Sequence, residues 1–163
     1  MLGLFFVNPF LISAAVIPAI FLMVKVYKAD KAEKEPAGLL VMLVVFGAIS
    51  TAVAMILERI GVSVLSRLFE KDSLIYNALL YFVIVAFSEE GAKYFFMKKR
   101  TWNHPAFNYS FDAVVYAVFT SLGFALWENI SYVFSYGFSA ALVRAVTAIP
   151  GHSCFGVFMG MWY

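Results

Sequence analysis

The sequence is poor in charge and in cysteine, and both shortages limit what the protein can be. Charged residues make up 13% of the 163 positions, whereas hydrophobic residues make up 63%. A soluble domain carries roughly 25% charged residues, and a chain of this length folded in water could not bury so much apolar surface. The single cysteine, Cys154, excludes an internal disulfide framework. We therefore expect an integral membrane protein.

Several catalytic signatures are also missing. The sequence contains no HExxH zinc helix and no GxSxG nucleophile elbow. Asp30 and Asp72 lie in polar connections and only Asp112 lies near a hydrophobic segment, which argues against an intramembrane pair of aspartates. Glutamate and histidine are left as the candidates for chemistry. They can activate water directly or on a bound metal ion.

Long hydrophobic runs predict an all-α fold, a polytopic bundle of about five transmembrane helices. A spanning helix needs about 20 mostly apolar residues. The windows that meet this requirement are 4–26, 38–57, 74–97, 111–135 and 139–163. We treat 1–163 as a single transmembrane domain with a motif-bearing core at 74–163. The sequence ends in GMWY, an aromatic pair that either anchors the last span or precedes further spans of a longer chain.

The positive charges predict how these helices are oriented. Seven lysines and arginines lie in the first and third connections and three in the second: Lys25, Lys28, Lys31, Lys34, Lys98, Lys99 and Arg100 against Arg59, Arg67 and Lys71. Cytoplasmic connections carry the excess of positive charge, so we expect the N-terminus outside. The second connection also spaces Val64, Leu65, Leu68 and Phe69 along one helical face. This favours a short interfacial helix between spans two and three, although a plain amphipathic linker fits equally well.

Ionisable residues inside the hydrophobic windows mark a candidate site. They are Glu89, Glu90, Lys93, Glu128 and His152, with Asp112 and Arg144 nearer the ends of their windows. A charge at the centre of a spanning helix costs about 2.5–3.5 kcal/mol, so such residues need partners or a function. Counted at 1.5 Å per residue, Glu89 and His152 lie about 21 Å, and Glu128 about 12 Å, from the outer ends of their spans, so helix tilt allows all three to meet near the midplane. One polar site built from three spans is the functional interpretation, and structural ion pairing is the alternative.

The spacing within EEGAK constrains the roles of its charges. Glu89 and Lys93 are four residues apart and Glu90 and Lys93 three apart, so either pair can touch on a helix. We expect Lys93 to hold one glutamate while the other faces a crevice as an acid or base. The spacing does not decide which glutamate takes which role.

The last hydrophobic window combines a histidine with helix-loosening residues. Pro150 and Gly151 are expected to loosen the helix immediately before His152. Gly156 and Gly160 follow His152 at intervals of four, a stripe that lets a neighbouring helix approach closely. A purely structural histidine is the alternative at this position.

Three ordered motifs within about residues 75–163 resemble the PrsW family of bacterial intramembrane proteases, which is related to CAAX-processing and bacteriocin-immunity membrane proteins. The matching residues are Glu89, Glu90 and Lys93 of EExxK, Phe124, Glu128 and Asn129 of the second motif, and His152 of the third. The resemblance implies a multi-pass protease of the bacterial inner membrane. It implies that the protein makes the first cut in a single-span anti-sigma factor, which starts a stress response. CAAX-type relatives carry histidine at the position of Glu128 and asparagine at that of Gly156, so the oxyanion partner is unassigned, with Asn129 as one candidate.

The sequence thus predicts an intramembrane endopeptidase of glutamate or metal type. Glu89, Glu90 and His152 are the expected catalytic residues, supported by Lys93, Glu128 and Asn129. No cofactor is required by this interpretation, but Glu90, Glu128 and His152 supply ligands suited to zinc. The lipid bilayer is an expected partner and nucleic acid is not. A small proton-coupled transporter and a non-catalytic membrane protein of the same superfamily are the alternatives.

Overall fold

The computed structural model describes residues 9–31 and 33–163, which are helical apart from short connections. The helices are α1 (Pro9–Ala29), α2 (Ala37–Leu68), α3 (Leu74–Leu79), the π-helical segment η1 (Leu80–Val85), α4 (Ala86–Thr101), α5 (Ser110–Tyr136), α6 (Phe138–Val146) and α7 (Ala148–Met161). Within the described residues, α3, η1 and α4 join into one span and α6 and α7 into another, which gives five helices able to cross a membrane. The predicted all-α fold with five spans is confirmed. Residues 4–8 of the first predicted window lie outside the described residues.

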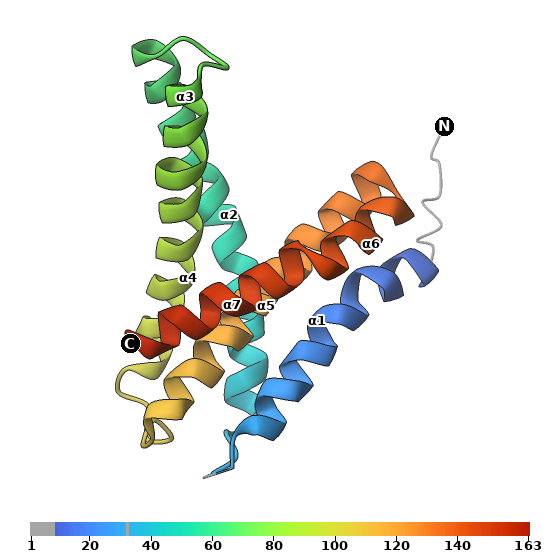
Figure 1. Ribbon diagram of the computed structural model, residues 1–163. Coiled ribbons are helices and arrows are strands. Elements are labelled where there is room, and N and C mark those ends of the chain that lie inside the picture. The colour runs from blue at the N-terminus through green and yellow to red at the C-terminus, as the bar shows by residue number, and fades with distance from the viewer. Residues whose placement is uncertain (1–8, 32) are drawn as a thin grey trace, which may run out of the picture.

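Helix α5 lies at the centre of the bundle. In its most hydrophobic 18-residue window 72% of the residues are buried, compared with 11–39% in the other four spans. Helices α1, α2 and α7 all pack against it (Figure 1). The other helices therefore present most of their apolar side chains to lipid, whereas α5 is enclosed by protein.

Glycines allow α2 and α7 to approach α5 closely. A Cβ atom on Gly123 of α5 would lie 2.7 Å from the Cα of Val44 in α2. A Cβ atom on Gly156 of α7 would lie 2.9 Å from the Cα of Val118 in α5, and one on Gly160 would collide with the backbone of α5. Small residues serve this purpose in membrane helix pairs. The expected glycine stripe after His152 is thus a packing face.

The third span contains a π-helical segment. It begins with α3, where the Ser73 side chain accepts a hydrogen bond from the backbone N–H of Tyr76 (3.2 Å). The segment η1 then widens the helix before α4, and it ends four residues before Glu89. Such bulges are frequent next to functional sites because they rotate the side chains that follow.

Two local expectations differ from the structure. Residues 61–68 continue α2 without interruption, so this part of the chain forms no separate interfacial helix. No proline interrupts this stretch, and the backbone N–H of Phe69 still bonds to the carbonyl of Leu65 (3.0 Å).

The second difference concerns the last span, which breaks at Thr147 instead of at Pro150 and Gly151. Thr147 has φ −118° and ψ −74° and separates α6 from α7. A proline ring clashes with the carbonyl of the residue four positions earlier, here Val146. The helix therefore ends before that clash, and Pro150 occupies the first turn of α7, where its missing N–H is not needed.

The first and third connections lie at the same end of the bundle. The Asn108 side chain donates a hydrogen bond to Glu33 across them (Nδ2 to Oε2, 3.1 Å). This agrees with their expected location on one side of the membrane, while the orientation of the N-terminus stays a prediction.

Candidate active site

Lys93 is the centre of a buried polar cluster. Its side chain is 0% exposed, and its ammonium group lies 3.2 Å from Oε2 of Glu89 and 2.7 Å from Oε1 of Glu90. The helical spacing in α4 places both carboxylates on one ammonium group. Lys93 therefore contacts both glutamates, not one of them as expected from the sequence. The aromatic ring of Phe124 from α5 lies 4.0 Å away and adds a cation–π contact.

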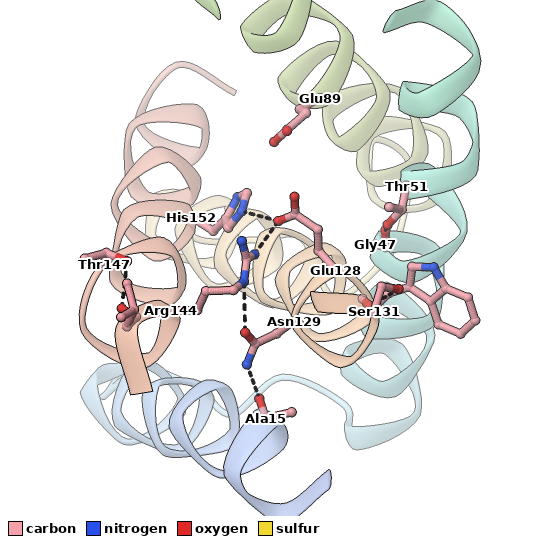
Figure 2. A network of polar contacts seen from close by, with 12 residues as sticks. Ala15, Gly47, Thr51, Glu89, Glu128, Asn129, Ser131, Arg144, Thr147 and His152 are labelled. Atoms are coloured by element: carbon pink, nitrogen blue, oxygen red, sulfur yellow. Dashed lines mark hydrogen bonds and ion pairs between the residues drawn. The ribbon is translucent and has the colours of Figure 1, made fainter. Parts of the chain in front are cut away.

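His152 connects this cluster to α5. Its Nδ1 lies 3.1 Å from Nζ of Lys93, and its Nε2 lies 3.2 Å from Oε2 of Glu128. Figure 2 shows Glu89 pointing from α4 toward His152 and Glu128. Helices α4, α5 and α7 each contribute to one polar cluster, the arrangement that the sequence depths of these residues allowed.

Arg144 of α6 fixes the position of Glu128. One guanidinium nitrogen donates to Oε2 of Glu128 (2.6 Å), and Nε donates to Oδ1 of Asn129 (2.9 Å). The Asn129 side chain in turn donates to the backbone carbonyl of Ala15 in α1 (2.7 Å; Figure 2). Both ends of the Asn129 amide are engaged and its side chain is fully buried. Asn129 thus joins α1, α5 and α6, and one N–H of its amide is taken by Ala15.

A pocket beside the cluster is lined by Glu58, a residue that the sequence analysis did not single out. The pocket measures ≈ 260 Å³ and lies between α2, α4 and α5, with Thr51, Glu58, Glu89, Phe124, Trp127, Glu128 and Tyr132 among its lining residues. Glu58 follows the predicted window 38–57 by one residue and was therefore assigned to a connection. Because α2 extends to Leu68, Glu58 lies inside a span.

Arg144 also received no role from the sequence. It is the only arginine or lysine in the 139–163 window, and a cation there requires a partner. This signal was sufficient to mark the residue, but the sequence could not show that its partners lie on α5.

The donor groups of the site suit a metal ion. Glu89, Glu90 and His152 each offer a ligand atom within 4.8 Å of the others, and Oε2 of Glu90 is buried without a hydrogen-bond partner. Carboxylate and imidazole ligands fit zinc. Glu128, expected in this set, instead contacts the other ring nitrogen of His152, where a carboxylate orients a ligating histidine. The three candidate ligands are also the side chains that contact the Lys93 ammonium group.

Five hydrophobic spans around partly exposed carboxylates, a buried lysine and a buried histidine define a polytopic membrane protein with a polar site inside the bundle. Residues 35–163 match the family model described as PrsW family intramembrane metalloprotease. The chain belongs to this family, which confirms the resemblance seen in its motifs.

Individual relatives agree with this assignment. The chain is similar to Protease PrsW of Oceanobacillus iheyensis, with 33% identity over 152 residues that cover 93% of this chain and 67% of the relative. It is 30% identical to Protease PrsW of Geobacillus kaustophilus over 153 residues (94% and 65%), and 29% identical to that of Bacillus subtilis over 153 residues (93% and 66%). The chain thus spans about two thirds of the length of these relatives. No solved structure matches it.

Proposed function

We propose that the protein is an intramembrane endopeptidase of the bacterial cell membrane that makes the first cut in a single-span membrane protein, an anti-sigma factor. The observation that carries this proposal is the contact of one buried lysine with Glu89, Glu90 and His152, residues from two separate spans. Paired carboxylates next to an imidazole are the groups that water activation needs. The family membership and the named relatives support the proteolytic class of the reaction.

The pocket suggests how the two glutamates divide the work. Glu89 lines the pocket together with Glu58 and Glu128, so it is placed to take a proton from water attacking a bound peptide. Glu90 is the closer partner of Lys93 and keeps that ammonium group in position. His152 contacts Glu128 through Nε2 and Lys93 through Nδ1, so it can protonate the leaving amine once one of these contacts opens, and the proton that Glu89 took from water then replaces the one it has given.

A metal ion in this site would be held by Glu89, Glu90 and His152. When bound, it would supply Lewis acidity and a water of lowered pKa. In that case Glu128 would set the orientation of the ligating imidazole from outside the ligand set. Arg144 would have the same role with or without the metal ion, because it holds Glu128 in place.

Cleavage by purified full-length protein in proteoliposomes, with an anti-sigma factor as substrate, tests the proposal. We expect Glu89→Gln and His152→Ala each to lower kcat by about 10²- to 10⁴-fold, the range of acid–base contributions. Glu90→Gln should lower kcat as well, because the Lys93 ammonium group loses its nearer partner. Glu70→Gln, at an exposed acid in the connection after α2, is the matched control and should cleave normally. If all three site variants insert correctly and still cleave at the normal rate, the proposal is wrong.

Metal analysis of the same samples separates the two mechanisms. The metal mechanism would be established by three results together. The unsubstituted protein binds zinc, Glu90→Gln does not, and chelated protein cleaves again only when zinc is added back. Full activity in metal-free protein would establish direct activation of water by the carboxylate.

A further inference from the structure

A second group of buried acids lies outside the active site, at the end of the bundle that holds the first and third connections. Asp30 follows α1, Glu35 precedes α2, and Asp112 lies in the first turn of α5. One carboxylate oxygen from each lies within 4.8 Å of the other two. The three residues are 1%, 4% and 0% exposed. Three segments of the chain thus meet in one acidic cluster that is shielded from solvent.

Several oxygens of this cluster have no hydrogen-bond donor. Both carboxylate oxygens of Asp30 and Oδ1 of Asp112 are buried without a partner. The other oxygen of Asp112 accepts from the backbone N–H groups of Asn108 (2.9 Å) and Tyr109 (2.7 Å), so it caps α5. Oε2 of Glu35 accepts from the hydroxyl of Tyr116. Unpaired buried polar atoms are rare, and each calls for an explanation.

Within the part of the chain that the structure describes, no side chain forms an ion pair with this cluster of Asp30, Glu35 and Asp112. Lys34 is near in sequence, but its ammonium group bonds to the backbone carbonyls of Tyr27 and Asp30 instead. Burying like charges in this way is costly unless a cation is shared among them.

We propose that Asp30, Glu35 and Asp112 bind a divalent cation that prefers oxygen ligands, Ca²⁺ or Mg²⁺. The donors are all carboxylate oxygens, and such ligands select these hard cations over zinc or copper. Water molecules complete the coordination, as is usual for Mg²⁺ and common for Ca²⁺. The cation joins the end of α1 to the starts of α2 and α5.

This site is separate from the proteolytic one. Asp112 and Glu128 are 16 residues apart on α5, which corresponds to about 24 Å along the helix axis. A cation bound at Asp30, Glu35 and Asp112 would therefore stabilise the bundle, because it would connect the end of α1 to the starts of α2 and α5. The proposal does not depend on the protein being a protease.

Thermal unfolding of the full-length protein in detergent, after chelation, tests the proposal. Addition of CaCl₂ or MgCl₂ should raise Tm by about 5 °C or more at a hundred times Kd, compared with NaCl of equal ionic strength. Asp30→Asn should lose this rise without lowering Tm in the chelated state, because the Asp30 side chain makes no hydrogen bond. Asp72→Asn is the matched control, an exposed acid in the connection between α2 and α3, and should respond like the unsubstituted protein.

Two further measurements keep the result unambiguous. Terbium luminescence, excited through the tyrosines, should report binding that Ca²⁺ competes away and that Asp30→Asn abolishes. The response to CaCl₂ should persist in Glu90→Gln, which separates this site from the catalytic one. An unsubstituted protein whose Tm ignores both CaCl₂ and MgCl₂ would overturn the proposal, as would an Asp30→Asn variant that responds fully. The first result would mean that shared protons neutralise the cluster, and the second that the cation stabilises the protein from another site.

Discussion

Lys93 is the residue whose replacement should disturb the active site most. Lys93→Met keeps a similar volume but leaves two half-buried carboxylates, 17% and 29% exposed, without their cation. Removing one partner of a fully buried ion pair costs about 3–5 kcal/mol. Because both carboxylates are partly exposed, we expect a loss at or below the lower end of this range in the free energy of unfolding, measured by denaturant titration in mixed micelles. Lys99→Met, at an exposed position of the same helix, should change it by less than about 0.5 kcal/mol.

The double variant Lys93→Met/Glu90→Gln refines this test. Glu90 is the nearer of the two carboxylates to the ammonium group, so its neutralisation should restore part of the lost stability. A Lys93→Met variant as stable as Lys99→Met would show that the ammonium group is not needed to balance these acids.

The roles of single residues were predictable where partners share a helix. Glu89, Glu90 and Lys93 lie three and four positions apart, and this spacing alone indicated their contact. The partners of Asn129 could not be predicted, because Ala15 and Arg144 come from helices far away in the sequence. An amide in an apolar helix looks the same in the sequence whether it faces a substrate or holds a neighbouring helix.

At the scale of helices, the contact between α5 and α7 should control the position of His152. Gly156 lies one turn after His152, and a Cβ atom there would be 2.9 Å from the Cα of Val118 and 3.1 Å from the carbonyl oxygen of Ala117. Gly156→Val should therefore push α7 away from α5. We expect a loss of about 1–3 kcal/mol in stability, the usual cost of overpacking, together with slower cleavage.

Gly151→Ala provides the matched control on the same helix. A Cβ atom at Gly151 meets nothing within 4 Å, so alanine should be neutral or slightly stabilising, as expected for replacing a helical glycine. Equal losses in Gly156→Val and Gly151→Ala would mean that helix propensity, and not the contact with α5, explains the effect.

Helix ends were harder to predict than helices. Pro150 and Gly151 correctly indicated an interruption in the last span, but the ring of Pro150 acts on the turn before it and so moves the break to Thr147. The π-helical segment before Glu89 had no recognisable signal, because its residues are as apolar as those of an ordinary spanning helix. The length of α2 was underestimated because Glu58 and Arg59 were taken as the end of the span.

At the scale of the whole molecule, the charge distribution predicts that the first and third connections face the cytoplasm. Single cysteines at Glu33→Cys and Glu70→Cys, in a Cys154→Ser background, report both sides without removing a lysine or arginine. A membrane-impermeant thiol reagent applied to intact cells should label the Glu70→Cys protein and spare the Glu33→Cys protein. The reverse pattern would invert the topology and contradict the charge argument.

The central position of α5 could not be predicted from hydropathy. The most hydrophobic windows of the third, fourth and fifth spans have mean hydropathies of 1.3, 1.4 and 1.3, yet 11%, 72% and 17% of their residues are buried. Lipid and protein interior are both apolar, so a helix can meet either with the same side chains. The number of spans is therefore readable from the sequence, whereas their arrangement depends on the glycine contacts and polar links between helices.

The pairing of Glu89 and Glu90 with Lys93 also bears on how the chain enters the bilayer during synthesis. All three residues belong to α4, so the ammonium group can offset one of the two negative charges as soon as this helix forms. His152 and Arg144 emerge from the ribosome only later, with α6 and α7. The apolar part of this span, residues 74–97, can thus partition into lipid with a formal net charge of −1, which lowers the insertion penalty that two unpaired acids would impose on the translocon.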